Sequence, residues 1–310
     1  MNGPFNIEYF DRRDGRKKMD PVASARFLRW AYNTRSGRWA EHWIFATRAF
    51  SRFYGWIHKS RWSRRKIGPF VRELGVDVAD MTRPLEEFRS FYDFFIRDID
   101  LSRRPSTSDP EICAAPVDGR VLAYSDIGPD RPFQIKRAVF DLRGFLQDDD
   151  LACRFAGGTL FISRLGLADY HYVHFPYAGV PGQSRPVAGK YHAGGPYSLR
   201  RLIPLYAENF RMVTPVNSDR FGRAVIAEIG ALGVGSIRQL FQPDSPVAKG
   251  AKKARFELGG STVALLFEKG TLEIDADLRA HTAEGIETYV RLGDSIGRIP
   301  GSVGRNPEPA

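Results

Sequence analysis

The hydrophobic periodicity of this chain changes at residues 101–111, and this change limits the folds that the sequence can adopt. Before the Pro- and Ser-rich segment LSRRPSTSDPE, large apolar residues recur every three or four positions, as in amphipathic helices. After it, short β-forming runs alternate with Gly, Pro and Asp, which predicts strands joined by turns. We therefore expect an α+β fold, with a helical region over 1–105 and a mixed or antiparallel β-rich region over 106–310.

The helical region contains four predicted helices. Asp20 and Pro21 are suited to cap and open the first one. An apolar face follows over residues 39–57, a short helix over 67–74 should end at Gly75, and a further helix is predicted over 82–99. The face over 39–57 is formed by Trp39, Trp43, Ala46, Phe50, Phe53 and Ile57.

The β-rich region contains no dinucleotide-binding glycine fingerprint, no phosphate-binding P-loop and no repeat at a fixed period. Its apolar runs are GRVLAYSDI, GTLFISRL, YHYVHF, RAVIAEIGALGVGSI and STVALLFEKGTLEI. The stretch RFELGGSTVALLF, residues 255–267, is broken by two glycines, although interior glycine weakens a strand. Either the break is a bulge or a hairpin bend, or the backbone has to be uncrowded there because the Gly260 carbonyl is attacked.

Basic and tryptophan residues are concentrated near the start of the chain. Between Arg12 and Lys66 there are 16 Lys and Arg against three acids, and all five tryptophans lie in this segment. The pattern is typical of helices that lie on an anionic membrane, with indole rings at the level of the headgroups. The alternative is a helical layer whose aromatic side chains pack on the core. A basic face also suits nucleic acid, but no nucleic-acid motif accompanies it, so we expect no such partner.

Several features bear on the cellular location. The first residues lack the apolar core of a secretory signal, and no apolar run approaches the roughly 20 residues of a membrane-spanning helix. Cys113 and Cys153 are far apart and lack metal-ligand spacing, which favours a reducing compartment over a disulfide framework. We expect a peripheral protein at the cytoplasmic face of a membrane.

Three short motifs could carry chemistry: Asp118 in APVDGRV, His171 and His174 in DYHYVHFPYAG, and Ser261 in GGST. Taken singly, each is ordinary, because Asp-Gly is common in hairpin turns and a strand histidine is usually a hydrogen-bonded structural residue. Together they supply the acid, the imidazole and the hydroxyl that nucleophilic catalysis by serine requires. On a straight strand His171 and His174 would point to opposite faces, so a shared site requires a bend.

These motifs resemble those of the phosphatidylserine decarboxylases, a pyruvoyl-dependent family that cleaves its own chain. The resemblance covers most of the sequence, and its most specific part is the Gly-Ser-Thr motif at 260–262. The other matching segments are FLRWAY, FSRFYGWIHKSRWSRRKIGPF, SFYDFFIRDIDLSRRP, APVDGRV, DYHYVHFPYAG, AENFRMV and IGALGVGSI.

The resemblance implies that the Gly260–Ser261 bond is cleaved, giving a long chain 1–260 and a short chain 261–310. Ser261 would become a covalent pyruvoyl cofactor. It also implies that His174 is the base for Ser261, that Asp118 orients this base, and that a protonated His171 returns a proton during decarboxylation. Phosphatidylserine would form a Schiff base with the pyruvoyl group, lose CO2 and leave as phosphatidylethanolamine. No metal is expected.

The expected partners are phosphatidylserine, an anionic membrane surface and the chain's own processed short chain, and a higher oligomer is left open. The sequence departs from the family pattern at Tyr172, where Arg is frequent, at Gly259, where Leu or Phe is common, and in the region of Tyr191 and His192. These departures bear on substrate choice, so the alternative is a pyruvoyl-dependent decarboxylase of a soluble amino acid.

Two other classes of protein remain as alternatives. A zinc hydrolase could use Asp118, His171 and His174, although a spacing of three along a strand is poor for two ligands of one metal. The other class is a non-catalytic lipid-binding or carrier module, because APVDGRV and RLGDSIGRI are similar to the paired turns of a biotinyl or lipoyl domain. The lysine turn of such domains is absent, and a module of this class would leave the chain uncleaved.

Overall fold

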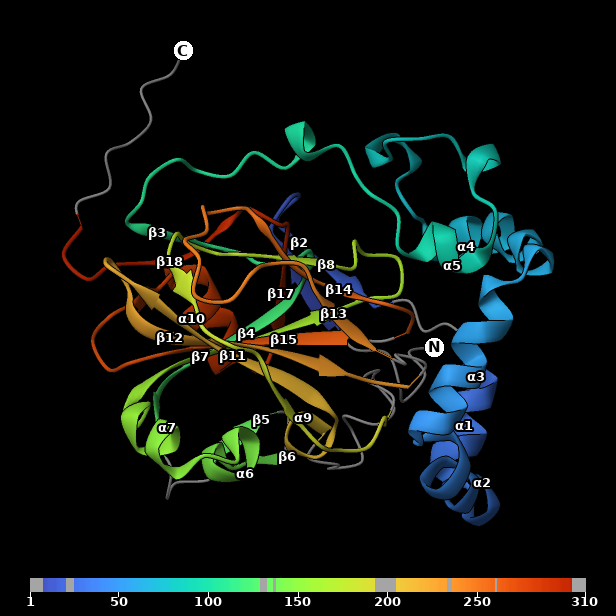
Figure 1. Ribbon diagram of the computed structural model, residues 1–310, viewed down its shortest axis with the longest axis horizontal. Helices are drawn as coiled ribbons and strands as arrows, with labels where there is room; N and C mark the ends of the chain where they lie inside the picture. Colours follow the sequence, from blue (N-terminus) through green and yellow to red (C-terminus); the bar gives the residue numbers. More distant parts are fainter. Residues whose placement is uncertain are drawn as a thin grey trace.

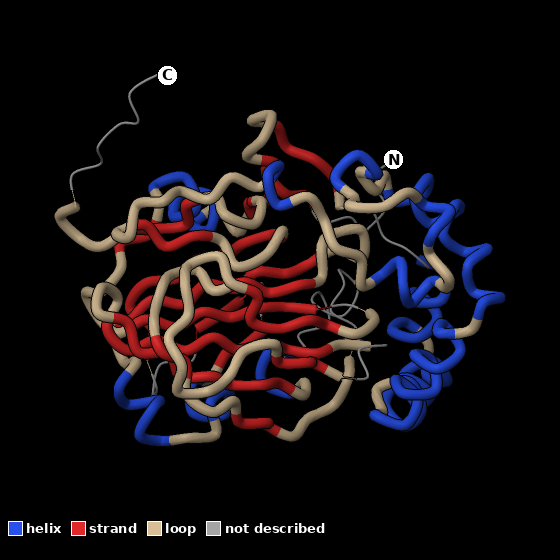
Figure 2. The backbone as a smooth tube through the Cα atoms, turned by 45° about the horizontal axis from the view of Figure 1, so that its top comes forward, coloured by secondary structure: helices blue, strands red, loops and turns tan. Residues whose placement is uncertain are grey.

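A computed structural model describes residues 8–20, 25–128, 133–135, 138–192, 205–232, 236–259 and 261–302. The predicted α+β class is confirmed, because most of the helices from the first part of the chain stand beside a β-rich core (Figure 1). Figure 2 shows most of the helices gathered on one flank of the strands, with a few short ones elsewhere around the sheets.

The core is built on one large sheet with the strand order β10-β11-β12-β15-β7-β4-β17-β1-β2, and β9 also pairs with β11. All neighbours are antiparallel except β1 and β17, which are parallel. The bounds are β1 Glu8–Asp11, β2 Arg16–Met19, β4 Gly119–Ile127, β7 Gly158–Leu165, β9 Val180–Pro181, β10 Arg185–Val187, β11 Arg211–Ser218, β12 Gly222–Gly230, β15 Ser261–Phe267 and β17 Glu287–Val290. Residues from both predicted regions therefore form this sheet.

Three smaller sheets surround the large one, in the orders β13-β14-β8, β16-β18-β3 and β5-β6. Their bounds are β3 Ile112–Ala114, β5 Phe133–Ile135, β6 Ala138–Phe140, β8 Tyr172–His174, β13 Ile237–Gln239, β14 Lys252–Phe256, β16 Glu273–Ile274 and β18 Ser295–Arg298. The apolar runs beginning at residues 119 and 158 match β4 and β7 at both ends, because turn-forming residues flank them.

Strand β15 lies between two hydrophobic cores, which explains its unbroken apolar sequence. Val263, Leu265 and Phe267 pack in one core, toward the smaller sheets, whereas Ala264 and Leu266 pack in the other, beneath short helices. The helices of the β-rich part are α6 Leu142–Leu146, α7 Asp149–Arg154, α9 Leu205–Glu208 and α10 Ala276–Ala283. Because both faces of β15 are covered, any apolar residue in it loses contact with water.

The helical layer comprises α1 Ala25–Asn33, α2 Arg35–Ala40, the π-turn η1 Glu41–Phe45, α3 Arg48–Lys59, the 3-10 turn η2 Arg61–Lys66, α4 Ile67–Leu74 and α5 Phe91–Phe95. Short 3-10 turns follow at η3 Val78–Asp80, η4 Leu85–Glu87 and η5 Leu101–Arg103. The predicted end of α4 is confirmed, since Gly75 adopts a left-handed conformation with φ of 64°. Phe91, Phe94 and Phe95 form an aromatic core with Leu258 of the β-rich part, so the two parts pack together.

Three predictions for the helical region need correction. The helix expected over 82–99 is only α5, because Ser90 caps it by accepting a hydrogen bond from the Asp93 N–H at 3.1 Å. The face over 39–57 is divided by the π-turn and by Thr47, which caps α3. The Asp20 carboxylate forms ion pairs with two core arginines instead of capping the helix described from residue 25, and Pro21 lies outside the described residues.

The glycine break at 255–267 is neither a bulge nor a hairpin bend. Strand β14 ends at Phe256 in the small sheet β13-β14-β8, and β15 begins at Ser261 in the large sheet. The chain therefore passes from one sheet to the other between Phe256 and Ser261, and Gly260 lies outside the described residues. Gly259 has a φ of 106°, a conformation that residues with a side chain rarely adopt.

Candidate active site

Ser261 is the first residue of β15 and lies between two neighbouring strands. Its Cα partners are Gly230 at the end of β12 and Leu165 at the end of β7. The residue is only 2% exposed, and its Oγ has no hydrogen-bond partner among the described residues. An unpaired buried hydroxyl is costly to stability, and such groups are often found where chemistry occurs.

His171 lies just before β8 and is fully buried. Its Nδ1 is 2.8 Å from the carbonyl oxygen of Asp169, and its ring packs against Phe95 with 4.0 Å between ring centroids. Because a carbonyl only accepts, Nδ1 carries the proton and Nε2 has a free lone pair. Nε2 has no hydrogen-bond partner in the described part of the chain. Burial, and secondly the charge of Arg97, lower the pKa of His171 to about 3, so the ring is neutral at physiological pH.

His174 lies at the end of β8, where both of its ring nitrogens are occupied. Nδ1 is 2.7 Å from the carbonyl oxygen of Gly250, and Nε2 is 3.3 Å from the hydroxyl of Tyr170. Nδ1 therefore donates and Nε2 accepts from the tyrosine. Burial lowers the pKa of His174 below its ordinary value, which keeps this ring in the neutral form as well.

Asp118 is buried in the turn before β4, and its carboxylate forms an ion pair with Arg104. It accepts two hydrogen bonds from Arg104, from Nε at 3.1 Å and Nη2 at 3.0 Å, and a third from the Leu292 N–H at 2.7 Å. Among the described residues, neither imidazole is hydrogen-bonded to it. The predicted Asp118–His174 pair is thus not formed directly; the nearest link is the backbone bond from His174 N–H to the Pro116 carbonyl, at 2.9 Å.

The strand pairings bring the Ser261 and His171 segments to neighbouring positions. Ser261 is opposite Leu165, and the turn that follows Leu165 leads to His171 six residues later. The His171 carbonyl in turn accepts a hydrogen bond from the Phe256 N–H at 3.0 Å, next to the crossing that leads to Ser261. The Ser261 Oγ and the His171 Nε2, both buried and without a partner among the described residues, therefore lie on neighbouring segments.

Arg97 is a site residue that the sequence analysis did not identify. Its Nη2 donates to the carbonyl oxygen of Ala168 at 2.5 Å, in the turn before His171. Burial lowers the pKa of Arg97 to about 10, and its Nη1 has no partner among the residues described. The sequence signal for Arg97 was its place in the segment FFIR, two residues after Phe95. Hydrophobic periodicity alone gives no reason to select this arginine as a site residue.

A polar cavity of about 210 Å³ lies beside this turn. Its lining includes Arg97, Arg104, Asp118, Arg120 and Asp169. The Asp169 carboxylate forms an ion pair with Arg120, and burial raises the pKa of this carboxyl. The cavity therefore connects the Asp118 turn with the turn that carries His171.

Asn209 is a second residue that the sequence analysis missed. Its amide nitrogen donates to the carbonyl oxygens of His192 and Gly230, both at 2.9 Å, and its oxygen accepts from the His192 N–H at 3.0 Å. The His192 Nδ1 lies 2.7 Å from a carboxylate oxygen of Glu41 in the helical layer. Since Gly230 is the Cα partner of Ser261, Asn209 connects the helical layer to the start of β15.

In the described part of the chain, no three His, Cys, Asp or Glu side chains gather in a way that could hold a metal ion. The residues of the zinc-hydrolase alternative are instead engaged separately: Asp118 with Arg104, His171 with Asp169 and His174 with Gly250.

A family model described as phosphatidylserine decarboxylase matches residues 91–298. A phosphatidylserine decarboxylase proenzyme from Chlamydia muridarum is 40% identical over 94% of this chain and 96% of its own length. The chain belongs to the phosphatidylserine decarboxylase family. The proenzyme from Chlamydia felis is 38% identical, with 95% of this chain and 99% of the relative covered. The proenzyme from Clostridium beijerinckii is 35% identical, with 94% and 98% covered.

As a phosphatidylserine decarboxylase family member, the chain is a decarboxylase, that is, a carboxy-lyase, and the resemblance stated from its motifs is confirmed. The relatives are named proenzymes, which implies that they are processed.

Proposed function

We propose that this protein decarboxylates phosphatidylserine to phosphatidylethanolamine and CO2, at a pyruvoyl group made from its own Ser261. The observation that carries the proposal is the buried Ser261 hydroxyl without a partner, at the start of a strand and directly after the chain crossing with its left-handed Gly259. A small group made from Ser261 suits this position, because its formation would break no hydrogen bond of the buried Ser261 hydroxyl with the described residues.

Self-cleavage follows from the chemistry of serine next to a peptide bond. The Ser261 Oγ loses its proton to a base and attacks the Gly260 carbonyl carbon, so the amide C–N bond breaks and an ester forms. Loss of the Ser261 α-proton then breaks the Cβ–O bond, which frees residue 260 as a carboxylate terminus and leaves dehydroalanine. Water adds to this residue and ammonia leaves, so residue 261 ends as a pyruvoyl group at the start of the short chain 261–310.

The base for this cleavage is proposed to be His174, with His171 as a second candidate. Family resemblance favours His174, although its Nε2 has to release the Tyr170 hydroxyl before it can accept a proton from Ser261. His171 is favoured by its free Nε2 lone pair. Asp118 would support His174 through the turn that holds the His174 backbone, rather than by a hydrogen bond to the ring.

His171 is proposed to begin decarboxylation as a neutral imidazole and to become protonated during it, so that it can return a proton as the resemblance implies. The phosphate and carboxylate of the bound substrate would raise the pKa of this ring, so that its free Nε2 could take a proton from the substrate ammonium group and make the amine nucleophilic. When formed, the pyruvoyl group would supply an electron-accepting carbonyl for this amine. After CO2 leaves, the imidazolium returns the same proton to the substrate carbon, and the ring is neutral again.

The proposed partner surface is an anionic membrane, contacted by the helical layer. Four tryptophans of this layer, Trp39, Trp43, Trp56 and Trp62, are exposed by 62–77%, so they do not pack on the core. Solvent exposure of this many indole rings beside basic side chains favours contact with lipid headgroups. Within the described ranges, no helix has the length and apolar character needed to cross a bilayer.

The reaction is tested by incubating purified protein with phosphatidylserine vesicles and, separately, with free amino acids such as serine. The proposal predicts CO2 release and phosphatidylethanolamine from the vesicles, and no product from the free amino acids. CO2 release from a free amino acid but not from vesicles would favour the alternative of a soluble substrate.

A further inference from the structure

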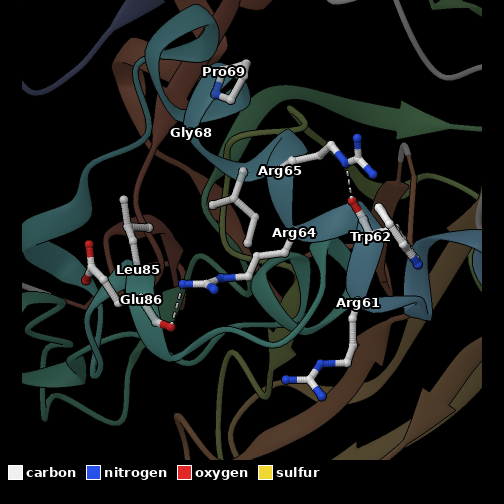
Figure 3. A pocket seen from close by; sticks show the side chains of 9 residues that line it. Arg61, Trp62, Arg64, Arg65, Gly68, Pro69, Leu85 and Glu86 are labelled. Atoms are coloured by element: carbon white, nitrogen blue, oxygen red, sulfur yellow. Dashed lines mark hydrogen bonds between the residues drawn. The ribbon is translucent and has the colours of Figure 1, made fainter.

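An open pocket of about 630 Å³ lies in the helical layer (Figure 3), and none of its lining residues belongs to the Ser261 site. Its floor and walls come from η2, from the start of α4 and from η4. The lining residues are Arg61, Trp62, Arg64, Arg65, Ile67, Gly68, Pro69, Leu85 and Glu86.

Positive charge in this pocket is not neutralised by acids. Arg64 donates from Nη2 to the Glu86 main-chain carbonyl at 3.0 Å, and Arg65 donates from Nε to the Trp62 carbonyl at 3.1 Å. Main-chain carbonyls orient a guanidinium without cancelling its charge, and Figure 3 shows the Arg64 group held in this way. Arg61 forms no hydrogen bond or ion pair with the described residues, and Glu86 is the one acid in the lining that the structure describes.

The backbone that carries these arginines is fixed by a buried serine. The Ser63 Oγ donates to the main-chain carbonyl oxygens of His58 and Ser60, both at 2.7 Å, and accepts from the Phe91 N–H at 2.9 Å. A 3-10 turn repeats every three residues, so Arg61 and Arg64 lie on the same edge of η2. The basic edge is therefore preformed, because Ser63 attaches the turn to α5.

Apolar surface adjoins the basic edge. Trp62 lines the pocket and is 77% exposed, and the Arg65 guanidinium lies over its ring at 4.8 Å. The preceding helix α3 exposes Phe53 and Trp56. A soluble anion would need the arginines alone, whereas a phospholipid offers both a phosphate for the arginines and an apolar part for the indole rings.

We propose that this pocket binds the phosphodiester of an anionic phospholipid within a membrane, as a site separate from the catalytic one. The proposal rests on the proposed contact of the helical layer with membranes. Arg61 and Arg64 would bind the phosphate oxygens with their planar N–H groups, and Trp62 would lie at the level of the headgroups. Such a site holds the enzyme on the membrane whether or not a substrate molecule occupies the active site.

The test measures binding to phosphatidylcholine vesicles with and without phosphatidylglycerol, a lipid that carries the phosphodiester but no amine to react. The pocket variant is Arg61→Gln with Arg64→Gln, and the matched control is Arg48→Gln with Arg52→Gln, which removes the same charge from exposed positions of α3. We expect the pocket variant to bind phosphatidylglycerol vesicles at least tenfold more weakly than the control does. Equal losses in the two variants would overturn the pocket, because they would show that only the total charge of the layer matters.

A third variant, Arg61→Lys with Arg64→Lys, keeps the charge but removes the planar donors. We expect it to recover only part of the binding, and complete recovery would contradict a phosphate site. Inorganic phosphate, compared with chloride at equal ionic strength, should weaken vesicle binding of the wild type but not of the glutamine variant. No competition by phosphate in the wild type would count against the pocket.

The outcomes separate this proposal from the one on which it rests. A wild type that binds neither kind of vesicle would refute membrane contact itself. A wild type that binds phosphatidylglycerol vesicles no better than the pocket variant does would refute the pocket alone. All variants should process their chain like the wild type, which is checked on a denaturing gel.

Discussion

The Nδ1 atom of His171 lies 2.8 Å from the carbonyl oxygen of Asp169, and this contact determines which ring nitrogen carries the proton. It leaves the Nε2 lone pair free and fixes the orientation of the ring, which Phe95 also holds by packing. A neutral, oriented imidazole without a partner on its second nitrogen is suited to accept a hydrogen bond from the ammonium group of a substrate.

The buried neutral state of His171 makes stability depend on pH. The pKa is about 3 in the folded protein and about 6.5 in the unfolded chain. Between these values the unfolded chain binds a proton that the folded protein does not, so the free energy of unfolding falls as the pH falls. We expect Ser261→Ala protein to lose up to about 1.4 kcal/mol per pH unit below pH ~6 through this residue.

Urea unfolding of the Ser261→Ala protein between pH 4 and 7, with and without His171→Gln, measures this effect. The slope against pH should be smaller by that amount once His171 is replaced. Identical slopes with and without His171 would show that the ring is not buried in its neutral form.

Arg104 is expected to stabilise the active-site turn rather than to react. It lies between two buried acids, at 2.6 Å from Asp80 and 3.0 Å from Asp118. Arg104→Gln would leave the buried Asp118 without its cation and Asp80 with only the longer Arg103 pair, so we expect a loss of about 3 kcal/mol in the free energy of unfolding. Urea unfolding in the Ser261→Ala background checks this loss.

The neighbouring Arg103 provides the control for this measurement, since its side chain is half exposed and its ion pair with Asp80 is longer, at 3.4 Å. Arg103→Gln should cost less than 1 kcal/mol, in the range of surface ion pairs. Similar losses for the two variants would argue against a special role for the buried pairs.

Asn209→Asp should slow self-cleavage, because it replaces an N–H donor with a carboxylate oxygen that faces two carbonyls. One of these carbonyls belongs to Gly230, the strand partner of Ser261. Appearance of the short chain after synthesis, followed on a denaturing gel, should be at least tenfold slower than in the wild type. Asn217→Asp, at an exposed position near the end of β11, should process at the normal rate. A normal rate in both variants would remove Asn209 from the positioning of Ser261.

Gly259→Ala should impair cleavage as well as stability. Alanine at a φ of 106° is strained, and we expect a cost of about 1–2 kcal/mol. Gly270→Ala meets a similar positive φ of 76° in open space, so it should cost similar stability while the chain is still cleaved at the normal rate. Equal cleavage rates for the two variants would show that the bare backbone at residue 259 is not needed for the reaction.

The sequence predicted the bounds of those helices and strands that begin or end at a nearby Gly, Pro or Asp. Gly75 ends α4 and turn residues bound β4 and β7, so these elements were predicted within their true limits. The sequence did not predict that β14 and β15 belong to different sheets, because two strands joined by glycines are equally compatible with a hairpin.

The candidate site was predicted only in part, for a physical reason. Ser261 and His171 carry reactive groups and stand in short motifs, so their residue types were informative. The partner of Asp118 is Arg104, and the partner of the Gly230 carbonyl is Asn209, which are tertiary contacts that no spacing in the sequence encodes. Likewise, exposure of the tryptophans could be decided only once the core was seen to be complete without them.

The central claim is that the protein breaks its own Gly260–Ser261 bond and converts residue 261 into a pyruvoyl group. Intact-mass spectrometry beside a denaturing gel, applied to purified wild-type and Ser261→Ala protein, tests it most directly. The account predicts a long chain 1–260 and a short chain 261–310 with a pyruvoyl mass at its start for the wild type, and one unbroken chain for Ser261→Ala. A single full-length chain in wild-type protein that decarboxylates phosphatidylserine would contradict it.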